Sequence, residues 1–317
     1  LRPICCDERY FYLVSKTLPI ENRGYGRHYS RFVDNLFPLP PIEEQPRIVA
    51  KVDELMALCD QLEQQTESSL DAHNLLVDTL LSTLTEARDA NELSDNWARL
   101  ADHFDTLITT DYAVEQLKQT ILQLAVQGKL VPQDPNDEPA SALLEKIATE
   151  KAELITAGKI KKQKALSKIT EDEIPFKLPD LWSWHKIGDY ALFTEYGLSD
   201  KAFDTSEGVP VLKMGDIQNG NVILGNKKRI PESVESLPAL YLEYGDLLYN
   251  RTNSAELVGK TGIFLGENNQ YTFASYLIRI KSSKDNSLSP YLNLAMQTPL
   301  FRETQIVPHL KQQCGQA

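Results

Sequence analysis

The segment that decides the architecture is Phe37–Gln65, which reads FPLPPIEEQPRIVAKVDELMALCDQLEQQ. Its first prolines favour an extended chain, because each proline disfavours helix at the residue before it. Beyond them, apolar residues recur at alternating steps of four and three, at Ile48, Val52, Leu55, Cys59 and Leu62. This spacing is typical of a coiled-coil seam. The seam resumes at Leu76 and Leu80, and the pattern predicts one helix from Glu43 to about Arg88, on the order of 70 Å long.

A helix with such a seam cannot bury it alone and therefore requires a second helix, from the same chain or from a partner. The seven seam residues named above are our candidates for a subunit or coiled-coil interface. We expect Cys59 to serve there as a small core residue rather than as a nucleophile, because free cysteines are among the most buried side chains.

The composition is that of an ordinary globular protein, with 317 residues, 42% hydrophobic and 25% charged. This length suggests two or three domains. The sequence shows no apolar stretch near the roughly 20 residues of a membrane span and no signal peptide. The four cysteines form no CxxC pair and have no histidine at metal-ligand spacing. We therefore expect no metal site and a cytoplasmic location.

The net charge of −12 at first argues against a nucleic-acid-binding protein. The acidity is concentrated between Pro41 and Gln116, where 17 acidic and 4 basic side chains give −13, which leaves +1 for the remainder. A solvated helix face explains such acidity without any function, and the rest of the chain is free to be locally basic. One basic run, either a solvated helix tail or a phosphate-binding segment, consists of Lys159, Lys161, Lys162, Lys164 and Lys168.

The character of the sequence changes along the chain. Residues 1–36 contain a short helix and a polar loop, residues 37–90 the long helix, and residues 91–174 a helical connector and a second helical segment. From residue 175 onward, glycines, prolines, aromatic residues and short alternating apolar stretches predict a mainly β region that a helix closes. The predicted fold class is therefore α+β, with a mainly β domain at residues 175–317 joined to a long coiled-coil helical spacer.

Motifs for catalysis are weak. The nearest is SAELVGKT, at residues 254–261. A phosphate-binding loop needs glycine where Ser254 stands, and it needs a helix after Lys260, where strand and turn are predicted. The LPPI segment near Pro41 lacks the Asn or Asp of an amino-methyltransferase loop. No serine nucleophile elbow or histidine pair stands out. We therefore expect a chain that is not an enzyme and that holds no cofactor.

Residues suited to DNA recognition occur in the predicted turns of the β region. Arg and Lys can pair with guanine or phosphate, and Asn can pair bidentately with adenine. Loops also contain such residues without any function. The segment YNRTNS, at residues 249–254, is the strongest candidate because it places Arg, Asn, Thr and Ser in one connection between strands. The candidate DNA-binding residues are Tyr196, Ser199, Lys201, Lys213, Asn219, Asn221, Arg251, Thr252, Asn253, Ser254 and Lys260.

Several of these segments resemble the specificity (S) subunit of type I restriction–modification systems. In the helical part, the resemblance is carried by PLPPIEEQPRIVAKVDELMALCDQLEQQ and LKQTILQLAVQGKLVPQDPNDEPASALLEKI. In the β region, it is carried by LPDLWSWHKIGDYA, GVPVLKMGDIQNGNV and GDLLYNRTNSAELVGKTGIF. It covers most of the chain from Phe37 onward.

The resemblance implies a subunit that recognises DNA and performs no chemistry. Such subunits have two target-recognition domains, each of which reads half of a bipartite DNA site. Helices that pack as an antiparallel coiled coil separate the two domains and dock methyltransferase (M) subunits, and a motor-nuclease (R) subunit joins for cleavage. S-adenosylmethionine and ATP are expected only on these partner subunits. A spacer of roughly 70 Å corresponds to about two turns of B-DNA.

By the same resemblance, residues 1–36 are the tail of a first recognition domain, and residues 175–317 are a second one without the spacer helix that should follow. The chain therefore looks truncated at both ends, and if it is complete we expect it to form a homodimer through the long helix or to be unstable alone. An alternative interpretation is a coiled-coil scaffold whose β domain binds protein. A third is a nucleotide-dependent enzyme that uses Lys260. Loss of specific DNA binding on substitution of Arg251 or Asn253 would separate the first interpretation from the scaffold.

Overall fold

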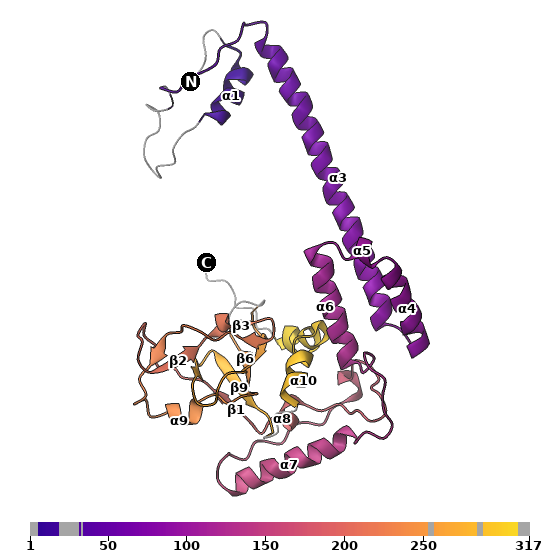
Figure 1. Cartoon of the computed structure of the whole chain (residues 1–317), viewed down its shortest axis with the longest axis vertical. Helices are drawn as coiled ribbons and strands as arrows, with labels where there is room; N and C mark the ends of the chain where they lie inside the picture. Colours follow the sequence, from indigo (N-terminus) through magenta and orange to yellow (C-terminus); the bar gives the residue numbers. More distant parts are fainter. Residues whose placement is uncertain (1–5, 19–31, 33, 253–256, 284–287, 310–317) are drawn as a thin grey trace. The chain divides into compact units, whose positions relative to one another are not determined.

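The computed structural model describes residues 6–18, 32, 34–252, 257–283 and 288–309 (Figure 1). The chain divides into two compact units, Leu1–Leu76 and Val77–Ala317, and each is described by itself. Helix α3 (Gln45–Thr85) belongs to both, and its 41 residues correspond to about 62 Å. The predicted long helix and the α+β class are confirmed, although the helix begins and ends two to three residues inside the predicted limits.

In the first unit, the proline segment joins α1 (Glu8–Thr17) to the start of α3. Gln45, at the start of α3, is 1% exposed and connects the proline segment to the residue before α1. Its Oε1 accepts a hydrogen bond from the backbone N of Asp7 at 2.7 Å, and its Nε2 donates to the carbonyl of Pro40 at 3.0 Å. The Phe37 ring stacks on Phe11 with centroids 5.3 Å apart. The proline segment is thus a specific joint between two helices.

In the second unit, the end of α3 packs with α4 (Ala90–Asp102), α5 (Phe104–Leu107) and α6 (Asp111–Val126). The core of this group is Val77, Leu81, Leu84, Leu100, Leu107, Ala113 and Leu124. Lys129 closes the end of α3, because its Nζ donates to the carbonyls of Thr85 at 2.6 Å and Ala87 at 2.9 Å. Across the described residues, none of the helices combines the length and the apolar character of a membrane span.

Helix α7 (Ala140–Thr156) and α8 (Ile187–Tyr190) border the β region, and α7 lies beside α8 (Figure 1). The contact depends on Lys151, whose Nζ donates to the carbonyls of Gly188 at 3.1 Å and Ala191 at 3.0 Å. The remaining helical segments are α9 (Leu237–Leu240), α10 (Leu288–Ala295), α11 (Pro299–Phe301), a π-helical turn at Arg302–Ile306 and 3-10 turns at Glu171–Glu173, Met214–Asp216 and Val307–His309.

The β region contains a six-stranded sheet in the order β1-β9-β6-β7-β4-β3 and a three-stranded sheet in the order β5-β2-β8. Neighbouring strands are antiparallel, except for the pairs β4–β7 and β2–β8. The strands are β1 (Phe193–Tyr196), β2 (Val209–Leu212), β3 (Ile217–Gln218), β4 (Asn221–Val222), β5 (Arg229–Ile230), β6 (Leu247–Asn250), β7 (Thr261–Ile263), β8 (Thr272–Phe273) and β9 (Leu277–Lys281). Helix α10 packs against β7, and the mainly β texture predicted from residue 175 is present.

A group of buried charges ties β9 to its surroundings. Arg279, which is 5% exposed, pairs with Glu195 of β1 and donates to the carbonyl of Tyr241 at 2.7 Å. Asp246 is fully buried and accepts from the Nζ of Lys281 at 2.8 Å. Burial raises the pKa of Asp246 above the usual carboxyl value, and the neighbouring Lys281 ammonium opposes that rise. The sheet therefore depends on charges that must stay paired.

Candidate nucleic-acid interface

Two of the predicted recognition residues meet at the ends of β1 and β6. Tyr196 is the last residue of β1, and Arg251 follows the last residue of β6. They converge because β9 lies between the two strands, and Ile278 of β9 is opposite both Tyr196 and Tyr249. The Arg251 guanidinium carbon lies 4.8 Å from the centroid of the Tyr196 ring. The sheet register thus builds an exposed arginine–aromatic pair.

Hydrogen bonds fix the inner side of Arg251. Its Nε donates to the carbonyl of Ser275 at 3.0 Å, and its backbone N donates to the carbonyl of Tyr276 at 3.2 Å. In the described part of the chain, its two terminal nitrogens donate no hydrogen bond. A planar guanidinium that is held on one side and exposed on the other is suited to bidentate contact with a guanine edge or a phosphate.

Thr252 links this pair to a second loop. Its Oγ1 lies 3.7 Å from the Sδ of Met214, and Lys213, directly before Met214, is exposed. The structure therefore brings together Tyr196, Arg251 and Thr252. We call these three residues the Arg251 cluster. Sequence reasoning missed Tyr276, which is 51% exposed. The signal for Tyr276 in the sequence was its position between two apolar strands, in the segment TFASYLIR.

The other described candidates lie in separate turns. Asn219 and Gly220 have φ values of 47° and 74° and form the two-residue turn between β3 and β4. An Asn-Gly pair with positive φ at both positions is the sequence that a type I′ hairpin turn requires. Asn221 Nδ2 donates to the carbonyl of Asn219 at 3.0 Å, so both asparagines serve the turn. The carbonyl of Gly220 accepts from Nδ2 of Asn293 in α10 at 2.8 Å.

Ser199 and Lys201 are exposed in the loop after β1, and Lys201 Nζ lies 5.9 Å from the centroid of the Phe203 ring. Lys260 is exposed at the base of the β6–β7 connection, where its carbonyl accepts from the backbone N of Asn250 at 2.9 Å. Within the described residues, no hydrogen bond or ring contact joins these three or the two asparagines to the Arg251 cluster. Asn253 and Ser254 lie outside the described residues.

The predicted helix interface is exposed for much of α3. Leu55, Leu62 and Leu76 are 49%, 53% and 49% exposed, whereas Ile48, Val52 and Leu80 are half-buried. Cys59, which we expect to be a small core residue of that interface, is exposed in the single chain. From residue 54 to residue 72 every side chain of α3 is exposed, whereas α1 contacts the start of the helix through the Arg9–Asp53 pair and Leu80 packs against the core of the second unit. The seam remains available to a partner.

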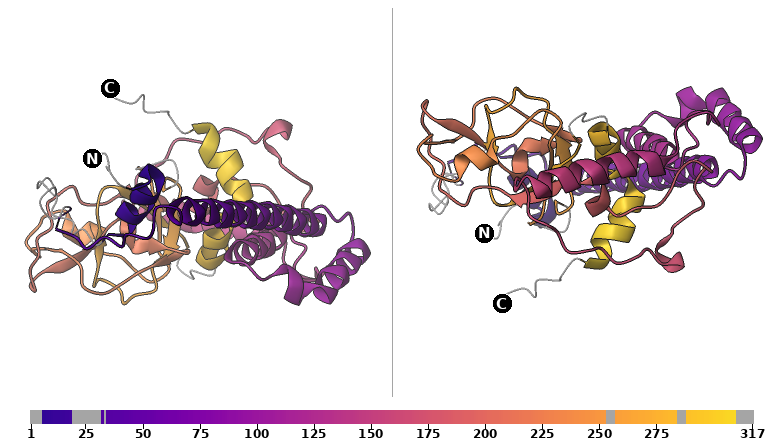
Figure 2. Two further views of the ribbon diagram at one scale, coloured as in Figure 1. Left: turned by 90° about the horizontal axis from the view of Figure 1, so that it is seen from above. Right: turned by 90° about the horizontal axis from the view of Figure 1, so that it is seen from below.

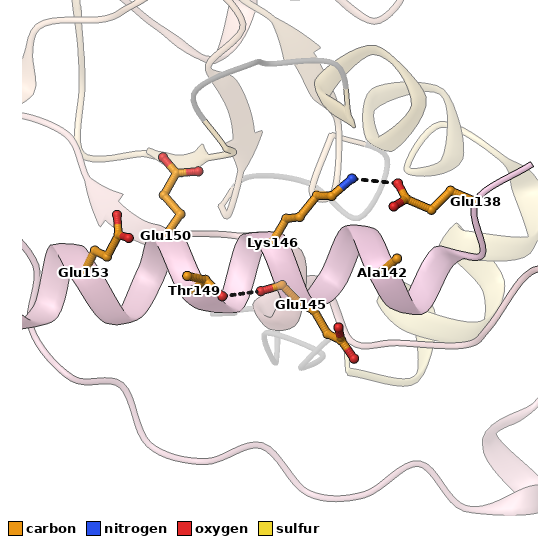
Figure 3. Close-up of a pocket in the computed structure, with 7 residues that line it drawn as sticks. All are labelled: Glu138, Ala142, Glu145, Lys146, Thr149, Glu150 and Glu153. Carbon is orange, nitrogen blue, oxygen red and sulfur yellow. Dashed lines mark hydrogen bonds and ion pairs between the residues drawn. The ribbon is translucent and has the colours of Figure 1, made fainter.

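Figure 3 shows a shallow depression along α7 and Glu138, two residues before the helix begins. Its lining includes four carboxylates and one lysine, Lys146, which pairs with Glu138 at 2.6 Å. Such an acidic surface disfavours DNA phosphates. Over the described ranges, no three His, Cys, Asp or Glu side chains lie close enough to hold a metal ion.

A cavity of about 960 Å³ lies between α6, α10 and the segment that precedes β1. Its lining is mostly apolar and aromatic, and it includes Trp182, Trp184, Tyr190, Tyr249 and Tyr291. Burial, together with the nearby Tyr190, raises the pKa of Tyr291 to about 12. The phenol therefore stays protonated at neutral pH and is not suited to general-base chemistry.

Two curated proteins are similar to this chain in sequence. The chain is 55% identical over 190 residues to the type I restriction enzyme EcoAI specificity subunit of Escherichia coli, a match that covers 60% of this chain and 32% of that protein. It is 40% identical over 294 residues to the EcoEI specificity subunit of the same organism, which covers 90% of this chain and 49% of that protein. The chain thus spans about half of the curated relatives' length or less.

No protein-family model matches the chain. Among solved structures, the HsdS subunit from Thermoanaerobacter tengcongensis aligns with 96% of this chain and 55% of that chain, at 16% identity and a TM-score of 0.34. That similarity is too low to bear on the fold.

Proposed function

Because this chain is a homologue of type I restriction enzyme specificity subunits, we propose that it recognises one half of a bipartite site in duplex DNA. In this proposal the chain performs no chemistry of its own. The Arg251 cluster supports it most directly, because an exposed guanidinium held over an aromatic ring can read a base edge in the major groove.

The proposal assigns the helices to subunit docking. Methyltransferase subunits bind the exposed seam of α3, and a motor-nuclease subunit joins them for cleavage. S-adenosylmethionine and ATP are bound by those partners. The exposed apolar side chains of the seam support this assignment, because a row of leucines at heptad spacing gains stability only when another helix covers it. The acidity around α3 is compatible with it, since a spacer need not bind phosphate.

The first test is a methylome. The chain is co-expressed with its methyltransferase subunit in a host without adenine methylation, and genomic N6-methyladenine is mapped. A new bipartite motif supports the proposal, and a palindromic motif indicates that two copies of this recognition domain act together. Association of the two proteins in soluble form without any new methylated motif contradicts the proposal.

The residue-level test is Arg251→Ala in the same assay, combined with duplex-binding measurements. Loss of one bidentate base contact should weaken specific binding by about 1–3 kcal/mol, or roughly 5- to 150-fold, and relax the motif at one position. Arg99→Ala is the matched control, because Arg99 is an exposed arginine on α4, outside the cluster. Equal effects of the two substitutions would remove Arg251 from the recognition surface.

A further inference from the structure

Five lysines between α7 and the turn at Glu171–Glu173 play no part in the site described above. Helix α7 ends at Thr156, and Gly158, at φ +69°, stops it in the left-handed conformation common after helix ends. The interpretation of these lysines as a helix tail is therefore wrong. Residues 161–170 follow an extended, arched path without helix or strand (Figure 2). All five lysines are exposed, namely Lys159, Lys161, Lys162, Lys164 and Lys168.

Three other side chains hold this lysine segment, residues 159–168, on the protein. Gln163 Oε1 accepts from the Nζ of Lys151 at 3.1 Å. Leu166 packs over Gly188, where an added Cβ would lie only 2.8 Å from the Leu166 Cδ1. Ser167 Oγ accepts from the Nζ of Lys186 at 2.8 Å. The segment is thus attached at three points while its lysines face solvent.

These five lysines differ in their pairing from several other lysines of the second unit. Other lysines of the second unit pair with carboxylates, as in Lys118–Glu115, Lys146–Glu138 and Lys227–Asp216. Among the described residues, none of the five forms an ion pair. The acidic residues that follow are partly engaged elsewhere, since Glu173 accepts from the backbone N of Thr170 at 2.9 Å and pairs with Lys186 at 3.4 Å.

We propose that the lysine segment binds phosphates of duplex DNA outside the bases that the Arg251 cluster reads. This inference rests on the proposed function and adds a second contact surface to it. Lysine is a compact, mobile point charge, which suits phosphate contacts that position a duplex better than base contacts that specify a sequence. In a chain with 45 acidic residues, an unpaired run of five lysines favours a polyanion as its partner.

The test compares two triple variants of the full chain with the same change in charge. The test variant is Lys161→Gln, Lys162→Gln and Lys164→Gln. The control variant is Lys51→Gln, Lys118→Gln and Lys146→Gln, whose lysines each pair with a glutamate. The probe is a mixed-sequence duplex of about 40 base pairs, and anisotropy gives its affinity from about 20 to 200 mM KCl, where phosphate contacts dominate. Circular dichroism checks that both variants fold.

Each phosphate contact contributes about 0.9 to the slope of log affinity against log salt. The test variant should therefore lose about 2 to 3 from that slope, and about 10- to 100-fold in affinity near 0.15 M salt. The control should keep the wild-type slope. The methylated motif of the test variant should be unchanged, because these contacts do not read bases.

The outcomes separate this inference from the proposed function. If the wild-type chain binds the duplex and the test variant keeps its slope, the lysine segment makes no phosphate contact, and the proposed function still stands. If the folded wild-type chain binds no duplex at all, the inference and the proposed function are both wrong. If the test variant loses association with the methyltransferase subunit but keeps its DNA slope, the segment binds an acidic protein surface and the inference is wrong.

Discussion

Replacing Lys129 with Met should destabilise the second unit by about 2 kcal/mol. The Lys129 ammonium donates to two carbonyls at the end of α3, those of Thr85 and Ala87, at 2.6 and 2.9 Å. Burial lowers the pKa of Lys129, with Glu92 opposing the shift, which shows that the ammonium has given up part of its hydration for these bonds.

The magnitude follows from the chemistry of those two bonds. A hydrogen bond from a charged donor contributes about 1.5–3 kcal/mol when buried. Lys129 is only partly buried, so water can replace much of what the substitution removes. The positive charge at a helix C-terminus adds about 0.3–1 kcal/mol. A net loss of about 2 kcal/mol corresponds to a fall in melting temperature of about 4–8 °C for a unit of this size.

The assay is urea unfolding followed by circular dichroism. Lys118→Met is the matched control, because Lys118 lies on α6 with a 63% exposed side chain and has only the 3.4 Å pair with Glu115. Loss of this pair should lower the unfolding free energy by less than about 0.5 kcal/mol. If Lys129→Met falls within about 0.5 kcal/mol of Lys118→Met, the assignment of Lys129 as the closure of α3 is refuted.

Three further substitutions test the fold. Gln45→Ala leaves the partly buried backbone N of Asp7 and carbonyl of Pro40 unpaired and should cost about 1–3 kcal/mol by urea unfolding. Gly197→Ala places a Cβ 2.2 Å from the carbonyl of Phe273 and should cost more than about 2 kcal/mol in the same assay. Asp246→Asn should remove the part of the pH dependence of the unfolding free energy that comes from this carboxyl group. Because the pKa of Asp246 is raised in the folded state, the folded protein keeps this carboxyl proton at pH values where the unfolded chain has lost it. The contribution of Asp246 to the unfolding free energy therefore falls as the pH rises from 3.8 towards the raised pKa.

Each of these substitutions has its own contradicting result. A Gln45→Ala protein as stable as wild type would mean that water satisfies the freed groups. A stable Gly197→Ala protein would show that the two backbones can separate at this point. For Asp246, the difference in unfolding free energy between wild type and Asp246→Asn is measured from about pH 4 upward. A difference that does not change with pH would show that the pKa of Asp246 is the same in the folded and unfolded states.

The long helix was predictable because its signals are local, but its buried face was not. A strict heptad seam drifts by about 20° per heptad on a straight α-helix, so over the four heptads from Ile48 to Leu76 the drift is about 80°. Counted at about 100° of rotation per residue, Val77 lies within about 20° of the helix face that carries Ile48. The structure buries Val77 and Leu81, each one residue after a predicted seam position (Leu76 and Leu80), and it also buries Leu84. The heptad spacing therefore does not by itself predict which face the end of α3 buries.

The recognition surface was predictable only in part, because it is assembled by strand order. Arg251 was singled out from its own short connection, and the structure leaves it exposed. Its neighbours come from β1, from the loop before β3 and from the turn before β9, and their proximity depends on β9 lying between β1 and β6. Residue type selected Asn219 and Asn221 equally well, yet their backbone geometry assigns them to a hairpin turn. A side chain that suits DNA therefore becomes a strong candidate only when the fold leaves its polar groups unused, and among the described candidates Arg251 meets that condition most clearly.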